Sequence, residues 1–254
     1  MKGFYAPYEI REGLRDANGN FVPFSVIEKD ERQVITDTTR LPARAIVQIE
    51  FVKDDAAYGC TGAMVSADTV LTAGHCVFSN GAWHGEFVIY PARNGGVKPF
   101  GRCGAKMLYA LRGWVTADAA IDSRLFDLGA IRLDCRVGER TGWFALSPGS
   151  NVVTRQRTRL SGYPCDKTPT GKQWLSKDRV RELATLKLFY ENDTYGCMSG
   201  APVFVDDDGK RIAAVHTNGI HGTQPPWNKN NAATRLTELR IQRLAGWMNE
   251  GDNQ

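Results

Sequence analysis

Three short segments of this 254-residue sequence hold the residue types that nucleophilic catalysis requires: LTAGHCV around His75, FDLGAIRL around Asp127, and GCMSGAPVF around Ser199. A serine hydroxyl is a poor nucleophile unless a nearby base removes its proton. A histidine that serves as this base needs a carboxylate to fix its tautomer. The order histidine, aspartate, serine therefore predicts a catalytic triad for acyl transfer.

The surroundings of these three residues fit the same chemistry. Cys60 precedes Cys76, so a disulfide between them would staple two strands and hold the loop that carries His75. Asp127 opens a run that becomes apolar, and a buried carboxylate needs a partner such as a histidine. Glycines on both sides of Ser199 allow a turn tight enough for backbone N–H groups to face a developing oxyanion.

Composition excludes several other classes of protein. Hydrophobic residues make up 42% of the chain, enough for a sizeable core. Lys and Arg total 32 against 28 Asp and Glu, without a basic block typical of nucleic-acid binding. No apolar run reaches the roughly 18 residues of a membrane span. We therefore expect neither a nucleic acid nor a membrane as partner.

The chain has six cysteines, in an even number that suggests three disulfides; they are Cys60, Cys76, Cys103, Cys135, Cys165 and Cys197. Neither a C-x-x-C pair nor zinc-type spacing occurs among them. Disulfides persist in oxidising compartments, so we expect a secreted or periplasmic protein, although no apolar run of signal-peptide length follows Lys2.

Most of the sequence consists of short β-type runs separated by Gly, Pro, Asn and Asp, which predicts an all-β fold of the sandwich or barrel type. Candidate strands occupy residues 45–51, 62–74, 86–92, 128–133, 151–164, 201–205 and 211–217. Only the carboxyl-terminal segment is helical in pattern. There, Leu236, Leu239, Leu244 and Trp247 recur close to one face.

Residues 1–25 differ from the rest because they are polar and rich in Gly and Asn. Two interpretations remain open. The segment is either a leader, whose removal after Ser25 leaves Val26 as a new amino terminus, or a flexible extension.

The segments TAGHC, DLGAI and SGAPVF resemble the signature blocks of trypsin-like serine peptidases, and of their glutamyl endopeptidase branch in particular. VIEKDERQVITDTTRLPARAI, SGYPCDK and NAATRLT are similar to further blocks of that branch. The resemblance implies two antiparallel six-stranded β-barrels with a site between them. Residues 26–145 would form the barrel with His75 and Asp127, and residues 146–254 the barrel with Ser199 and a terminal helix packed on it.

The same resemblance implies an oxyanion hole formed by the N–H groups of Cys197 and Ser199, polypeptide substrates, a monomeric enzyme and no metal or cofactor. Two alternative classes of protein are less consistent with the sequence. An inactive homologue that only binds would have lost a triad member, and none is lost. An α/β-hydrolase would need a G-x-S-x-G elbow and an Asp before the His, and neither pattern occurs.

Substrate preference has two candidate explanations in the sequence. Thr194 and His216 offer hydrogen-bond donors for a glutamate carboxylate, and the resemblance implies that the free amine of Val26 adds a positive charge. Asp193 instead stands where trypsin-like enzymes that prefer Arg or Lys carry their pocket Asp. His216 favours glutamate, with weaker cleavage after aspartate. We expect His84 and His221 at the surface.

Cys197 is a departure from the family, which almost always has Gly at this position. The backbone conformation required there disfavours side chains by about 1–3 kcal/mol, so the turn needs a restraint. We expect a Cys165–Cys197 disulfide to supply it, with two buried free thiols as the alternative. The resemblance supports Cys60–Cys76, and the positions of the remaining two cysteines suggest Cys103–Cys135.

Overall fold

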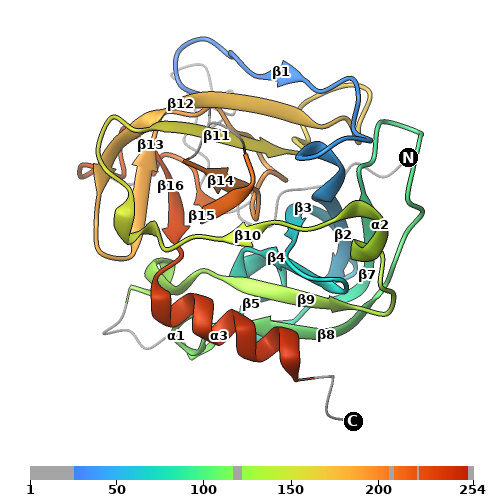
Figure 1. Cartoon of the computed structure of the whole chain (residues 1–254). Coiled ribbons are helices and arrows are strands. Elements are labelled where there is room, and N and C mark those ends of the chain that lie inside the picture. Colours follow the sequence, from blue (N-terminus) through green and yellow to red (C-terminus); the bar gives the residue numbers. More distant parts are fainter. Residues whose placement is uncertain (1–25, 117–121, 206–208, 222, 251–254) are drawn as a thin grey trace.

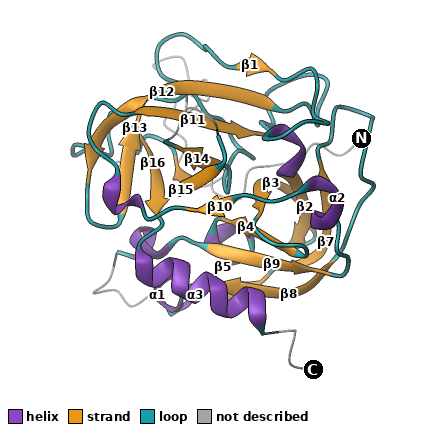
Figure 2. Ribbon diagram, viewed as in Figure 1, coloured by secondary structure: helices purple, strands orange, loops and turns teal. Residues whose placement is uncertain are grey.

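The computed structural model describes residues 26–116, 122–205, 209–221 and 223–250. This part of the chain is built mainly of antiparallel strands joined by short turns and helices, with a longer helix, α3 (Glu238–Asn249), near its end (Figures 1 and 2). The expected all-β class and the carboxyl-terminal helix are therefore confirmed.

The first barrel is a six-stranded sheet in the order β7-β2-β3-β4-β9-β8. An isolated bridge between Ile89 and Cys103 joins its two ends. Its strands, with the small ribbon β5–β6 beside them, are β2 (Ile46–Lys53), β3 (Ala56–Met64), β4 (Thr69–Thr72), β5 (Phe78–Ser79), β6 (Ala82–Trp83), β7 (Gly85–Pro91), β8 (Ala105–Ala110) and β9 (Gly129–Leu133).

The second barrel is a ring of six strands in the order β12-β11-β14-β15-β16-β13, which an additional pairing of β12 with β13 closes. Its strands are β11 (Arg157–Gly162), β12 (Trp174–Leu183), β13 (Lys187–Tyr190), β14 (Pro202–Phe204), β15 (Arg211–Asn218) and β16 (Asn231–Arg235). Two barrels of six strands agree with the expected architecture.

Short helical segments connect the strands and position the site. They are 3₁₀ turns at Ala43–Ala45, Gly74–Cys76, Ser123–Phe126 and Gly149–Asn151, and the one-turn helices α1 (Arg112–Val115) and α2 (Gly138–Thr141). The turn at Gly74–Cys76 contains His75, and the turn at Ser123–Phe126 directly precedes Asp127. These are the two residues of the expected triad that come from the first barrel.

Each barrel is filled by the side chains that its strands point inward. One buried cluster includes Ile49, Leu71 and Ile131 of the first barrel and continues to Trp247 of α3. A second cluster fills the other barrel, with Leu160 and Val203 among its members. Some strands have one buried and one solvent-facing side, and others are buried on both sides. Both kinds account for the β-type runs in the sequence.

Helix α3 packs on the first barrel and not, as expected, on the second. Thr237 caps its amino end by accepting a hydrogen bond from the Arg240 N–H. Trp247 stacks on Tyr109 of β8 with ring centroids 5.4 Å apart, and Figure 1 shows α3 running beside β8 and β9. Leu239, expected on the buried face, is 77% exposed. The periodicity indicated a helical face but not the sheet that receives it.

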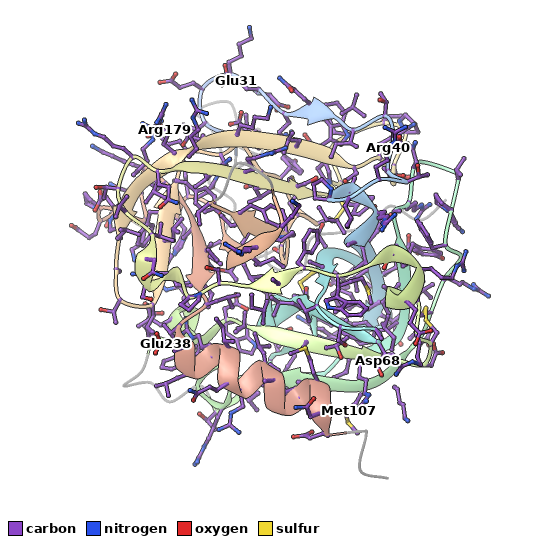
Figure 3. All side chains as sticks on the ribbon, viewed as in Figure 1. Glu31, Arg40, Asp68, Met107, Arg179 and Glu238 are labelled. Atoms are coloured by element: carbon purple, nitrogen blue, oxygen red, sulfur yellow. A yellow bond between two sulfur atoms is a disulfide. The ribbon has the colours of Figure 1, made fainter. Side chains whose placement is uncertain are left out.

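Two further short strands pair with strands of the second barrel. The strand β1 (Gln33–Val34) pairs antiparallel with β12, and β10 (Ala145–Leu146) pairs parallel with β15. The amino-terminal segment therefore lies on the second barrel, although its residues precede the first one. Figure 3 shows Glu31 of this segment above β12, on the opposite side of the molecule from Glu238 of α3.

Candidate active site

His75 and Asp127 form a buried pair at the end of the first barrel. Nδ1 of His75 lies 2.7 Å from Oδ2 of Asp127, and the backbone N–H of His75 donates to Oδ1 at 2.9 Å. Both side chains are 1% exposed. Since an ionised carboxylate only accepts hydrogen bonds, Nδ1 carries the proton, which leaves the Nε2 lone pair as the basic position of the ring.

The charge of Asp127 is maintained by its partner. Burial acts to raise the pKa of this carboxyl, but the charge of His75 and the hydrogen bonds that it donates outweigh burial, and the pKa lies below its ordinary value. Gly74 is required for this approach, since a Cβ there would lie 2.9 Å from the Trp114 ring and 3.1 Å from Oδ1 of Asp127. An ionised, fully desolvated carboxylate is thus held against the histidine.

Ser199 lies in the loop between β13 and β14 and contacts the turn that carries His75. Its carbonyl accepts a hydrogen bond from the Thr61 N–H at 2.8 Å, and the same oxygen is 3.7 Å from Sγ of Cys76. A disulfide joins Cys60 to Cys76. These contacts fix the backbone of Ser199 beside the residue that follows His75, and so bring the serine and histidine segments of the two barrels together.

The turn before Ser199 is held by its carbonyl groups. The Gly196 carbonyl accepts from the Cys165 N–H at 2.9 Å, and the Cys197 carbonyl accepts from Oγ1 of Thr61, also at 2.9 Å. In a trans peptide the C=O and the next N–H point in opposite directions. The N–H of Cys197 therefore points away from Cys165, as a donor to an oxyanion requires.

Cys197 has a φ of 72°, a left-handed conformation, as its place in the expected oxyanion turn demands. A disulfide joins it to Cys165, with Cα atoms 5.6 Å apart. The strained residue is thus tied to the loop that binds the carbonyl before it. The further disulfide joins Cys103 to Cys135, so the cysteines pair as expected, and no free cysteine occurs among the described residues.

Gly200 allows the serine segment to approach the first barrel. Its φ is 87°, and a Cβ at this position would lie 2.0 Å from the Thr61 carbonyl oxygen and 2.1 Å from Oγ1 of Thr72. Thr61 therefore contacts both sides of the turn. This role of Thr61 was not predicted from the sequence, although the position of Thr61 directly after a disulfide cysteine was a signal that it lies near the site.

Thr194 and His216, the expected pocket residues, are both buried. Within the described residues Oγ1 of Thr194 has no hydrogen-bond partner, and the side chain is 0% exposed. Nδ1 of His216 lies 2.8 Å from the Tyr190 hydroxyl. Burial, assisted by the charge of His75, lowers the pKa of His216 to about 3, so the ring is neutral. Tyr190 was not identified from the sequence, because nothing in it indicated a contact across β13 and β15.

Asp193 faces the amino-terminal segment. Its two carboxylate oxygens accept hydrogen bonds from the N–H groups of Ile27 and Glu31, at 2.9 and 2.7 Å. Val26 is thereby held one residue from the contact with Asp193, which itself adjoins Thr194. The expected leader, residues 1–25, lies outside the described residues.

The expectation that His84 lies at the surface was wrong, because the side chain is buried beside the backbone carbonyl of His75. Nε2 of His84 lies 3.2 Å from the carbonyl of His75, and its ring stacks on Phe51 with centroids 4.8 Å apart. Burial lowers the pKa of His84 to about 4. His221 is half-buried, with Nε2 at 2.6 Å from Nη1 of Arg124.

Two groups of possible metal ligands occur in the described chain: Cys60, His75 and Cys76, and Cys103, Asp134 and Cys135. In each group both cysteines are joined in a disulfide, so their sulfurs are unavailable as thiolate ligands. The residues do not fit a metal site.

The comparison with known families agrees with this fold and site. The family model described as "Trypsin-like peptidase domain" matches residues 60–213, more than half of the chain. The chain belongs to the trypsin-like peptidase family, and the protein is a peptidase.

Individual relatives are more specific. The chain is 36% identical to the "Glutamyl endopeptidase" of Bacillus licheniformis over 96% of its own length and 71% of that protein. It is 37% identical to the "Extracellular metalloprotease" of Bacillus subtilis over 90% and 71% of the two chains. A solved "Structure of Glu endopeptidase in complex with MPD" superposes with a TM-score of 0.77 at 23% identity, over 87% of this chain and 98% of that one.

Proposed function

We propose that the protein is a serine endopeptidase that hydrolyses the peptide bond after glutamate, and less readily after aspartate. The observation that carries the mechanism is the buried His75–Asp127 pair next to the backbone of Ser199. Relatives called glutamyl endopeptidase support the preference, together with a buried hydroxyl that lacks a partner in the described structure, that of Thr194.

In this mechanism the Ser199 hydroxyl attacks the carbonyl carbon of the substrate while Nε2 of His75 takes its proton. Asp127 keeps the other proton on Nδ1 and stabilises the imidazolium that forms. The N–H groups of Cys197 and Ser199 donate to the oxyanion. Return of the proton to the leaving amine gives an acyl-enzyme, and a water molecule, deprotonated by His75, then releases the acid product.

Glutamate specificity would come from donors that become paired only when a carboxylate enters. An unpartnered buried hydroxyl lowers the stability of the folded protein by about 1–3 kcal/mol. A substrate carboxylate that accepts a hydrogen bond from Thr194 would remove this cost. His216 is the second donor, oriented by Tyr190. A free amine at Val26 would supply the positive charge, since Ile27 is fixed at Asp193 next to Thr194.

The competing preference for Arg or Lys would need the carboxylate of Asp193 in the pocket. Both of its oxygens accept hydrogen bonds from the amino-terminal segment instead. This arrangement argues against Asp193 as the group that binds substrate.

We further propose an exported, monomeric enzyme that acts on polypeptides without a cofactor or nucleic acid. Three disulfides and a relative named as extracellular support export. Within the described ranges, no helix combines the length and the apolar character of a membrane span.

The proposal is tested by Ser199→Ala together with a burst measurement. In a chain that begins at Val26, the wild-type enzyme should release one acyl leaving group per molecule rapidly from an active-site titrant, whereas Ser199→Ala should release none and melt at the same temperature. His75→Ala should be about as severe, because residues that act together in one mechanism lose it together. Normal turnover by Ser199→Ala would refute the mechanism.

Specificity is tested separately by digestion of a random peptide library, with the residue before each cut identified by mass spectrometry. Glutamate should dominate, followed by aspartate. Cuts mainly after Arg or Lys would show that Asp193 is the pocket residue.

A further inference from the structure

Arg32 carries a completely buried charge in the segment between Val26 and β1. Its side chain is 0% exposed. The guanidinium donates to the carboxylate of Asp30 through Nε and Nη2, each at 2.8 Å, and to the carboxylate of Asp166 through Nη1 and Nη2 at 3.0 and 2.5 Å. Lys167 adds a bond to Asp30 at 2.5 Å. Two acids and two bases thus form a neutral cluster.

This cluster lies against the turn that ends at Ser199. Nη1 of Arg32 is 4.0 Å from Sδ of Met198, the residue between Cys197 and Ser199. The guanidinium carbon is 5.9 Å from the centre of the Tyr195 ring. Arg32 therefore contacts the turn on both sides of Cys197.

A second connection runs through Asp166. This residue follows Cys165, whose Sγ is bonded to Cys197 and whose N–H donates to the Gly196 carbonyl. Any displacement of Asp166 would thus be transmitted to the peptide group whose N–H is expected to donate to the oxyanion.

Physical chemistry makes this arrangement strongly dependent on arginine. The buried charge of Arg32 is tolerated because its hydrogen bonds are made, and removal of a carboxylate partner would leave this charge without compensation. Two carboxylates in one plane match the fork of a guanidinium, whereas an ammonium offers a single point of contact. The cluster therefore holds three segments in one geometry: residues 27–32, residues 165–167 and residues 195–199.

We propose that Arg32 is a positioning residue for catalysis, which holds the 195–199 turn in the conformation that aims the Cys197 N–H at the oxyanion, and so couples the seating of segment 27–32 to turnover. The proposal depends on the proposed serine peptidase function. Arg32 itself does not touch the substrate. The same segment binds the turn region a second time, through the N–H groups of Ile27 and Glu31 on Asp193.

The test compares Arg32→Lys, Arg32→Gln and Asp166→Asn with Arg136→Gln. The control removes an ion pair with Glu139 that is more than half exposed on both sides. Loss of one oxyanion donor typically lowers kcat by about 10²–10³-fold, so a misplaced turn should lower kcat per titrated active site by more than about tenfold. KM should change less than kcat, because Thr194 and His216, the proposed pocket donors, are not substituted.

Arg32→Lys keeps the charge but loses the fork, and it should be nearly as impaired as Arg32→Gln. Asp166→Asn, which keeps the shape of the side chain, provides the measurement if neither Arg32 variant folds. Arg136→Gln should match the wild type in kcat and KM.

The positioning role is overturned if folded Arg32→Lys and Asp166→Asn keep the wild-type kcat per titrated site. It is also overturned if these variants lose only melting temperature and no activity. A wild-type chain that begins at Val26 and shows no acyl burst would overturn the proposed function and this inference with it. A normal wild-type burst with normal variants would overturn the inference alone.

Discussion

Thr194 illustrates how a single residue can serve function at a cost in stability. Its hydroxyl is buried and unpartnered in the described structure, an arrangement that native proteins largely avoid. Exceptions to local rules of this kind concentrate at functional sites. This observation supports the proposal that the hydroxyl is a donor reserved for the substrate carboxylate.

Thr194→Val tests this interpretation because the two side chains have nearly the same shape. We expect the melting temperature to rise, since an unsatisfied buried hydroxyl is removed. We also expect kcat/KM for a peptide with glutamate before the cut to fall by about tenfold or more, since a buried hydrogen bond to the substrate is lost. Calorimetry and peptide kinetics measure the two effects.

Thr194→Ser is the control, because it keeps the hydroxyl and should keep most of the activity. A Val variant with unchanged kinetics would remove Thr194 from the pocket.

His84 and His216 make stability depend on pH. Burial lowers the pKa of His84 to about 4 and that of His216 to about 3, below the ordinary value of 6.5. Above 6.5 both residues are neutral in the folded and unfolded protein. As the pH falls below 6.5, only the unfolded chain takes up these protons, so their contribution to folding stability is lost progressively toward pH 4 and below.

His84→Phe should isolate one of these titrations. Phenylalanine keeps the stacking on Phe51 but cannot be protonated. The wild type should be the more stable protein at about pH 7.5, where the bond to the His75 carbonyl counts, and its advantage in melting temperature should shrink toward about pH 4.5. Phe87→Leu, which changes another ring stacked on Phe51, should show a constant difference. A constant difference for His84→Phe as well would contradict the shifted pKa.

At the scale of elements, the oxyanion turn combines an unfavourable backbone conformation with covalent restraint. A non-glycine residue in the left-handed region costs about 1–3 kcal/mol. At Cys197 this cost is opposed by the disulfide to Cys165 and by hydrogen bonds to the carbonyls on both sides of the Cys197 N–H. The turn of this chain is thus held by its surroundings, where a glycine would adopt the same φ without strain.

Cys165→Ser should therefore lower kcat by more than tenfold, because the turn relaxes toward a conformation in which the Cys197 N–H no longer faces the substrate. The double variant Cys165→Ser/Cys197→Gly should recover much of the activity, since glycine needs no restraint. Stopped-flow measurement of the acylation rate separates this effect from substrate binding. A Cys165→Ser enzyme with unchanged kcat would refute the role of the disulfide.

The sequence predicted some elements well and others not at all, for identifiable reasons. Strands with an apolar side, such as β2, β7 and β9, were recognised within a few residues. β12 was missed because the charged run Lys177, Asp178 and Arg179 interrupts the alternation of apolar and polar residues, and β16 because its NAATR sequence has small residues that fit between two neighbours.

The residues of the candidate site divide in the same way, into those that a local motif predicts and those that it does not. The residues of the expected triad lie within local motifs that resemble the blocks of the family. The same resemblance supported Cys60–Cys76, and the other two disulfide pairs were inferred from the expected positions of neighbouring strands and loops. The contacts of Arg32, His84 and Tyr190 join segments that are far apart in sequence or cross between strands, and no local pattern records which partner a buried polar group will find.

At the scale of the molecule, the amino-terminal segment is the part that connects the barrels. It enters along the second barrel at Asp193 and Asp166, pairs through β1 with β12, and then leads into β2 of the first barrel. Residues near position 26 are therefore fixed beside Asp193, next to the proposed substrate pocket, before the first barrel begins. This path makes the chemical state of the Val26 nitrogen important.

Removal of residues 1–25 should activate the enzyme, because a free α-amine at Val26 would bring a positive charge to the proposed pocket. A chain that begins at Val26, released from a fusion without extra residues, should exceed the full-length chain in kcat/KM for glutamate peptides by more than about tenfold, as a charged hydrogen bond to the substrate would give. The same peptides with glutamine should show a smaller difference.

The decisive comparison is with a chain that begins at Ser25. If the leader acts only by its bulk, removing all but one residue of it should give full activity. If the charge must stand next to Ile27, where the Asp193 carboxylate fixes the backbone at 2.9 Å, one additional residue should leave the enzyme nearly as weak as the full-length chain.

The pH profile provides an independent check. An α-amine has a pKa of about 7.7–8.0, so the advantage of the Val26 form should be present below this range and decline as the pH rises through it. Equal activity of all three chains would reject the leader as an inhibitor and the Val26 amine as a pocket residue.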